Sequence, residues 1–112
     1  MSEITWDDFD QVDIRVGRVV ESEPFPEARK PSIKLVVDFG EPIGTRRTSA
    51  QLTTYYEPEA LMGRQVVAVV NLPPKRIAGF KSEVLVLGVP DDAGEVVLLS
   101  PDYDVPLGGR MF

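Results

Sequence analysis

The sequence predicts an all-β fold, a small barrel of five short strands with one helix between the third strand and the fourth. Three observations support this fold class. Five short segments carry the alternating or continuous apolar pattern of strands, and proline or glycine bounds most of them. The segment between the third and the fourth has proline near its start and glycine at its end, as short helices do. The 112 residues provide for one domain around one core.

The N-terminal segment 5–11 (TWDDFDQ) predicts a short amphipathic helix. Thr5 is a good N-cap, and Asp8 stands at the position that completes a capping box. Trp6 and Phe9 lie on one face of this helix. Because a helix of one or two turns is not stable alone in water, these rings must pack on the domain or on a partner chain.

Residues 13–23 predict the first strand, and Gly17 is expected to bend it, because a glycine inside a strand often marks a bulge. A long, bent first strand is what a small Greek-key barrel requires. The other expected elements follow in chain order. They are a loop at 25–31, strands at 32–39 and 45–53, a helix at 55–62, strands at 65–71 and 83–89, a turn at 90–95 and an additional strand at 96–99.

The segment between the fourth and fifth strands predicts a stiff basic loop. Pro73-Pro74 ends the fourth strand, because proline has no N–H to donate to a ladder. Three cations and two apolar side chains follow, which favours a surface that receives an anionic or partly apolar ligand. The alternative is a solvated hairpin loop whose apolar side chains belong to the core. The five residues are Lys75, Arg76, Ile77, Phe80 and Lys81.

The chain has no cysteine and no histidine. This excludes disulfides, thiolate metal sites, zinc sites of the usual kind and imidazole acid–base catalysis. Most carboxylates stand in turn-like or terminal contexts such as Asp7-Asp8 and Asp91-Asp92, where a solvated surface is the ordinary interpretation. We therefore expect no enzyme, no metal and no cofactor.

No apolar run approaches the roughly 20 residues that a membrane helix needs. The acidic N-terminus lacks the basic and apolar parts of a secretory signal. We expect a cytoplasmic protein without membrane insertion.

The net charge of −6 is unevenly distributed. Residues 29–81 hold nine Lys and Arg against four Asp and Glu, a charge of +5, whereas residues 1–28 carry −6 and residues 82–112 carry −5. A basic face on an acidic protein is possible, but its long-range attraction for a polyanion should be weak.

Four motifs in this chain resemble those of the tRNA-binding domain family, in the family's order. Residues 13–17 (DIRVG) resemble D-x-R-V-G, and residues 34–40 (KLVVDFG) resemble K-L-x-x-x-V-D-x-G with two residues fewer between Leu and Val. Residues 56–63 (YEPEALMG) resemble Y-x-P-E-x-L-x-G, and residues 71–83 (NLPPKRIAGFKSE) resemble N-L-x-P-x-x-x-x-G-x-x-S-E. Each motif alone is a weak signal, but the ordered series is specific.

The resemblance implies a five-stranded OB fold, a partly open Greek-key barrel, in a single domain 1–112 with its core at about 13–88. Residues 1–12 and 96–112 are then extensions whose apolar side chains a small barrel is not expected to cover. A two-fold homodimer is the simplest arrangement that covers them, and the alternative is that both extensions fold back on their own barrel. The expected interface residues are Trp6, Phe9, Val97, Leu99, Met111 and Phe112.

Within the family, the whole chain most resembles the CsaA-type chaperones, through residues 25–29 (FPEAR), 49–51 (SAQ) and 74–87 (PKRIAGFKSEVLVL). Val84-Leu85 stands where most tRNA-binding members have Gly-Met. The resemblance implies a homodimeric chaperone for non-native proteins or precursors for export, with secretion machinery as a further partner. No G-x-x-x-x-G-K-[ST] loop is present, so we expect ATP-independent binding.

The alternative function is tRNA binding, in which the same cations contact phosphates and a ring such as Phe80 or Tyr55 stacks on a base. A third is a structural domain that docks on another enzyme. The residues expected to bind peptide or tRNA are Lys34, Phe39, Arg46, Arg47, Ser49, Gln51, Lys75, Arg76, Ile77, Phe80, Lys81 and Ser82.

Overall fold

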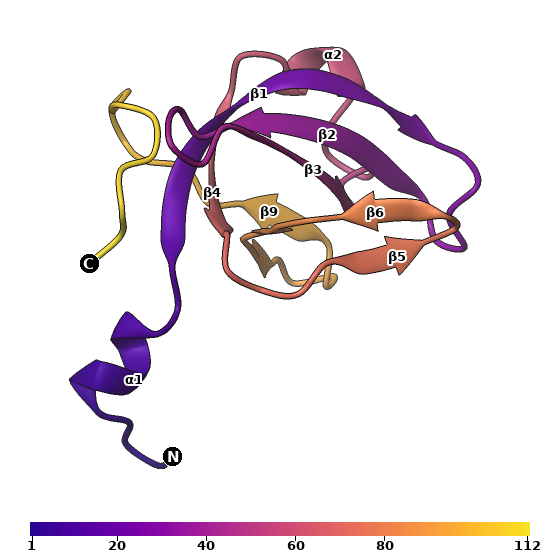
Figure 1. The fold of residues 1–112 in the computed structure, drawn as a ribbon. Helices are drawn as coiled ribbons and strands as arrows, with labels where there is room; N and C mark the ends of the chain where they lie inside the picture. The colour runs from indigo at the N-terminus through magenta and orange to yellow at the C-terminus, as the bar shows by residue number, and fades with distance from the viewer.

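The computed structural model describes all residues from Met1 to Phe112. It is built almost entirely of strands that curl around one core, with two short helices (Figure 1). The elements in chain order are α1 Trp6–Asp10, β1 Ile14–Phe25, β2 Ser32–Asp38, β3 Thr45–Ala50, α2 Pro58–Leu61, β4 Gln65–Val69, β5 Lys75–Ile77, β6 Phe80–Ser82, β7 Leu85–Val86, β8 Gly88–Pro90 and β9 Val96–Leu98.

Strand β1 is the centre of the main sheet, whose order is β3-β2-β1-β4-β7. Its first part pairs antiparallel with β4, from Ile14 to Arg18, and its second part pairs with β2, from Arg18 to Phe25. The β1–β2 register shifts between Val19 and Glu21, so Val20 is an extra residue in a bulge. A bulge bends and twists its strand, which lets β1 belong to both halves of the curled sheet.

The barrel closes where β3 meets the chain just before β7. The backbone N–H of Glu83 donates to the carbonyl of Arg47 at 2.7 Å, and the Arg47 N–H donates to the Glu83 carboxylate at 2.9 Å. Beneath them the buried Thr48 hydroxyl donates to the carbonyl of Val84 at 2.8 Å and lies 3.1 Å from the Ser82 hydroxyl. These contacts confirm the predicted OB-type barrel.

The core is formed by the inward faces of the barrel strands. Alternation in β2 sends Ile33, Leu35 and Val37 inward, and Phe39 follows them. The structure corrects the expected role of Gly17. This residue pairs regularly with Val66, and the bulge lies three residues later. Gly17 is needed for space, because a Cβ there would lie 2.5 Å from the Val37 side chain and 2.8 Å from the Phe39 ring.

Replacing Gly17 with alanine should therefore destabilise the protein by about 1–3 kcal/mol through overpacking. Urea denaturation followed by far-UV circular dichroism measures the change. Gly109→Ala is the matched control, because a Cβ there meets its nearest atom at 3.5 Å, an ordinary contact. Equal stability of the two variants would contradict the packing role of Gly17.

The structure differs from the prediction in several elements. The helix expected at 55–62 is only α2, because Glu57 precedes Pro58 and takes the extended conformation that such a position favours. The strand expected at 83–89 is divided into β7, which pairs with β4, and β8, which pairs with β9. The basic loop contains a hairpin, β5–β6, whose turn places Ala78 and Gly79 at positive φ.

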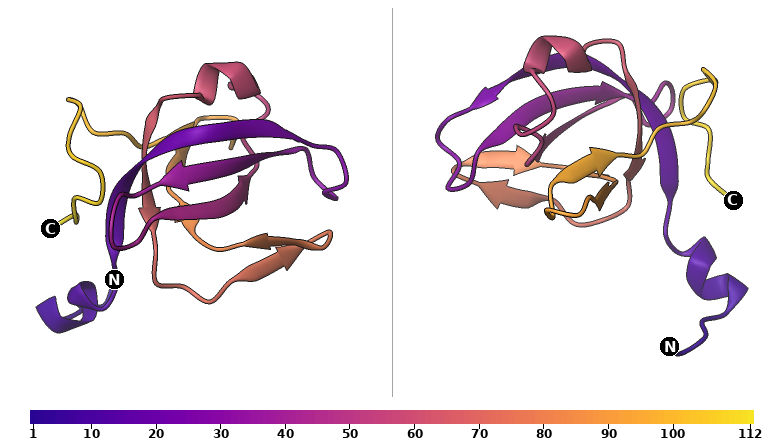
Figure 2. Two further views of the ribbon diagram at one scale, coloured as in Figure 1. Left: turned by 45° about the horizontal axis from the view of Figure 1, so that its top comes forward. Right: turned by 180° about the vertical axis from the view of Figure 1, so that it is seen from behind.

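The two ends of the chain behave differently (Figures 1 and 2). Helix α1 has the predicted Thr5–Asp8 capping box but stands away from the barrel. The C-terminal segment returns to β1, where the Gly108 N–H donates to Val16 and the Met111 N–H to Ile14. Arg110 joins the two ends by donating to the Asp10 carbonyl at 2.6 Å. No helix in the structure has the length and apolar character needed to cross a membrane.

Candidate functional site

The basic residues of the middle of the chain carry no ion pairs. Three arginines, Arg15, Arg18 and Arg110, form all the salt bridges, and each pairs with an aspartate. The nine Lys and Arg of residues 29–81 have no acidic partner within 4 Å. The predicted basic segment is thus present as uncompensated positive charge, which is available to a ligand.

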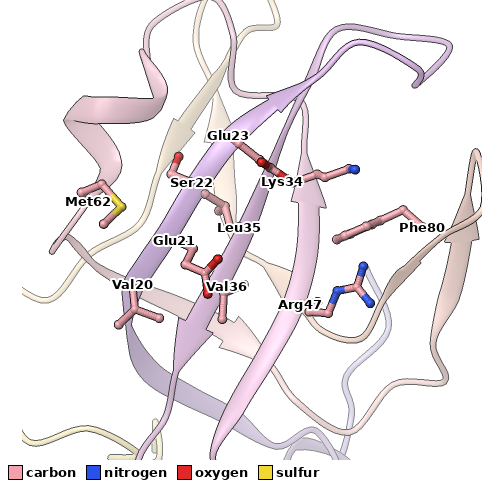
Figure 3. A pocket seen from close by; sticks show the side chains of 10 residues that line it. All are labelled: Val20, Glu21, Ser22, Glu23, Lys34, Leu35, Val36, Arg47, Met62 and Phe80. Atoms are coloured by element: carbon pink, nitrogen blue, oxygen red, sulfur yellow. The ribbon is translucent and has the colours of Figure 1, made fainter.

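Two hollows lie beside the β5–β6 hairpin, and each is lined by residues of it. The first hollow has a volume of about 420 Å³ and lies on the outer face of β1, β2 and β3 (Figure 3). It is lined by Val20, Glu21, Ser22, Glu23, Lys34, Leu35, Val36, Arg47, Met62 and Phe80. Two of these side chains are basic and two are acidic, so the net charge of the first hollow is zero.

Strand alternation explains why these side chains gather. Lys34 and Val36 point outward from β2, opposite the core residues Ile33 and Leu35. Arg47 stands beside Val36 in the β2–β3 register and points to the same face. The hairpin then folds over this face and adds Phe80 as one wall.

Phe80 is held by an aromatic and cationic cluster. Its ring packs edge to face on Phe25 with centroids 5.4 Å apart. Lys34 Nζ lies 5.1 Å from the Phe80 centroid and Arg47 Cζ lies 4.5 Å from it, on either side of the ring in Figure 3. Both cations are attracted by the ring electrons, so Phe80 is 8% exposed and fixes the hairpin to the sheet.

The second hollow is larger, about 690 Å³, and lies between loop 26–31, β3 and the segment 72–86. Half of its 18 lining residues are hydrophobic, and three cations stand among them against one acid. The lining residues are Ala28, Arg29, Lys30, Ser32, Ser49, Ala50, Gln51, Leu52, Leu72, Pro73, Lys75, Ile77, Ser82, Glu83, Val84, Leu85, Val86 and Val96. The one acid, Glu83, already accepts the Arg47 N–H.

The structure divides all but one of the residues expected to bind a ligand, Phe39 being the exception, into three groups. Five of them line the second hollow, namely Ser49, Gln51, Lys75, Ile77 and Ser82. Lys34, Arg47 and Phe80 line the first hollow. Arg46, Arg76 and Lys81 line neither hollow.

The expectation that Phe39 lines a binding pocket is wrong. Phe39 is 0% exposed and belongs to the central core cluster. It continues the inward-facing series of β2, and its ring fills the space that Gly17 leaves open. Ser82 is also more structural than expected, because its hydroxyl accepts the Ser49 N–H at 3.2 Å and lies beside Thr48 at the barrel seam.

Sequence reasoning missed part of each hollow. In the second hollow the residues that sequence reasoning missed include Arg29, Lys30 and Leu72, which come from two loops far apart in the chain. A basic pair in a proline-bounded loop is a signal for the first two. In the first hollow Val20 and Met62 are exposed apolar residues that no motif marks.

Tyr55, a candidate for base stacking, is engaged with the β8–β9 hairpin. Its hydroxyl donates to the carboxylate of Asp91, whose oxygens also accept the N–H groups of Ala93 and Glu95. The hydrogen bond from Tyr55 lowers the pKa of Asp91, and the same bond raises the pKa of Tyr55. The ring is 54% exposed, so its faces remain partly open. No group of three or more acidic side chains is placed to hold a metal ion.

The residues expected at a dimer interface are exposed or partly exposed. Trp6 is 85% and Phe112 is 108% exposed, and Val97, Leu99 and Met111 each exceed a third. Phe9 is half-buried. The alternative, in which both extensions fold back, holds for the backbone of the C-terminal segment but not for these side chains.

Comparison with known proteins gives a consistent result. A family model described as a putative tRNA binding domain matches residues 14–110. The crystal structure of the chaperone CsaA from Bacillus anthracis strain Ames is 52% identical and has a TM-score of 0.93, covering 99% of this chain and 100% of that one. The CsaA chaperone protein from Picrophilus torridus is 47% identical with a TM-score of 0.90, covering 98% of this chain and all of that one.

Curated relatives include methionine–tRNA ligases. The ligase of Methanocaldococcus jannaschii is 37% identical over 111 residues, which are 99% of this chain and 17% of the ligase. The chain therefore spans less than a fifth of the length of such relatives, and the likeness is to their tRNA-binding domain.

Proposed function

Because the chain belongs to the tRNA-binding domain family and is similar to CsaA chaperones over its whole length, we propose that it is an ATP-independent chaperone for non-native polypeptides. Its clients would be extended segments of unfolded proteins, including precursors for export, and it would act in the cytoplasm, with secretion machinery as a further partner.

The observation that carries this proposal is the second hollow. Its apolar residues, such as Leu72, Ile77 and Leu85, offer a surface for a leucine or phenylalanine side chain of a client. Three cations stand around them, Arg29, Lys30 and Lys75, and would contact carbonyl or acidic groups of the client. Full burial of one such side chain stabilises a complex by roughly 1.5–3 kcal/mol. Affinity of this order is modest, so a client can leave without nucleotide hydrolysis.

The active form would be a homodimer. Helix α1 and the C-terminal residues lie close to each other, since Arg110 donates to the Asp10 carbonyl. Their uncovered apolar side chains need a surface that the monomer does not supply, and a two-fold partner presents the same patch in return.

Trp6→Ala should convert a dimer to a monomer, because Trp6 is the largest exposed apolar side chain of α1. We expect the dissociation constant to rise by at least about tenfold, measured by light scattering over a dilution series. Met62→Ala is the control, since Met62 is 50% exposed but lies outside both extensions. A wild-type monomer, or a Trp6→Ala variant that stays dimeric, would contradict this assembly.

A second candidate function is tRNA binding. The nine unpaired cations of residues 29–81 favour it, as does the likeness to the methionine–tRNA ligases. The net charge of −6 opposes it. The two functions predict different responses to salt, because phosphate contacts weaken as salt rises whereas apolar burial does not.

A competition titration tests the proposal. A fluorescent, uncharged 20-residue segment rich in Leu and Phe is bound at physiological salt, and unlabelled tRNA is then added. Under the proposed function the segment binds and tRNA does not displace it. Displacement at low tRNA concentration, or no binding of the segment, would indicate that the cations of residues 29–81 bind RNA instead.

A further inference from the structure

The two hollows differ in their charge. The second hollow holds Arg29, Lys30 and Lys75 against Glu83, a net of +2. The first hollow holds Lys34 and Arg47 against two acids, a net of zero. Without those two acids both hollows would be cationic, and together they would carry +4.

The two acids are Glu21 and Glu23, both on β1. They are the only carboxylates in the first hollow, both are exposed, and neither accepts a hydrogen bond or forms an ion pair. Figure 3 shows them on the strand beside Lys34 and Val36, across the hollow from Phe80.

The bulge at Val20 is the reason that these acids face the hollow. Before it, Val19 points into the core opposite Val37, and without the extra residue Glu21 would point inward as well. A shift of one residue exchanges the two faces of a strand. After the shift Glu21 stands beside Val36 and Glu23 stands beside Lys34, both outward.

Lys34 does not neutralise its neighbour Glu23. The two residues are direct partners in the β1–β2 register, yet Lys34 Nζ lies over the Phe25 ring at 4.6 Å and forms no ion pair. The cation–π contacts direct the ammonium group towards the hairpin. The carboxylates of β1 therefore form no ion pair with the cations of β2 and β3.

We infer that Glu21 and Glu23 are specificity residues that exclude polyanions from the first hollow, on the outer face of β1, β2 and β3, and so favour polypeptide over RNA. Adjacent strands are about 4.8 Å apart, so the acids stand roughly 5–10 Å from a phosphate held at Lys34 or Arg47. This is comparable with the Debye length of about 8 Å at physiological ionic strength, so the repulsion is only partly screened. An uncharged polypeptide segment experiences no such repulsion.

This inference rests on the proposed function, and one pair of variants tests it. Glu21→Gln/Glu23→Gln removes both charges, and Asp92→Asn/Asp102→Asn is the matched control, with the same change in net charge at exposed positions outside both hollows. Binding of 3′-fluorescein-labelled tRNA is measured by anisotropy from about 50 to 200 mM salt. Binding of the Leu- and Phe-rich segment is measured in parallel.

We expect the glutamine variant to bind tRNA about tenfold more tightly than wild type at physiological salt, and the control less than about twofold. Its plot of log K against log salt should be steeper by about 1.5. Lys34 and Arg47 would each become free to hold a phosphate, and each such contact contributes about 0.7–0.9 to the slope. Affinity for the segment should not change.

Equal gains in the glutamine variant and the control would overturn the inference, since net charge alone would then set RNA affinity. A loss of segment binding in the glutamine variant would also overturn it, because the acids would then contact the client. Failure of the wild type to bind the segment would refute the proposed function, while the tRNA comparison would still decide the role of the glutamates.

Discussion

Replacing Phe39 with alanine is expected to destabilise the protein by about 3–5 kcal/mol, the usual cost of truncating a buried phenylalanine. Phe39 is fully buried, and its ring lies against the position where Gly17 lacks a side chain. A small domain has roughly 5–15 kcal/mol of total stability, so this loss is a large fraction of it. Thermal and urea denaturation measure the change.

The same variant separates two roles for Phe39. As a core residue, it should affect stability strongly and affinity for the client only through the unfolded fraction. Phe39→Leu is the control, since it keeps most of the buried volume and should lose clearly less stability than the alanine variant. A Phe39→Ala protein of native stability that no longer binds the client would restore Phe39 to the binding site.

Ile77→Ser is expected to weaken client binding by about tenfold, which corresponds to about 1.4 kcal/mol of lost apolar contact. Ile77 is partly exposed on β5 and faces the second hollow, so the fold should lose little stability. Fluorescence titration with the Leu- and Phe-rich segment measures the affinity.

Arg76→Ser is the matched control for Ile77→Ser. Arg76 precedes Ile77 on β5, is exposed and lines neither hollow. It should leave segment binding unchanged and, if tRNA binds, reduce the slope of its salt dependence by about one phosphate contact. The opposite pattern, with the segment sensitive to Arg76 and not to Ile77, would contradict an apolar client site. Phe80→Ser is less informative, because the Phe80 ring also fixes the hairpin between Lys34 and Arg47.

The predicted fold class agrees with the structure because its signals are local. Alternation in Ser32–Asp38 determines which side chains are inward, and the Thr5–Asp8 box determines where α1 begins. Proline and glycine mark most of the loops. A hairpin loop was one of the two interpretations of the basic segment, but its strands β5 and β6 were not predicted, because the turn is Ala78-Gly79 and lacks the Asn-Gly or Asp-Gly pattern that usually indicates such a turn.

Residue type and short spacing were enough to predict the all-β class, the chain order of the five barrel strands, the family and the basic character of residues 29–81. Which cations share a hollow depends on the three-dimensional arrangement of the strands and loops. The tertiary structure separated Arg46 from Arg47 by strand alternation, buried Phe39, and placed loop 26–31 beside the hairpin. The bulge at Val20 is the clearest case, because one extra residue turns Glu21 outward, and only the pairing of β1 with β2 shows where that residue lies.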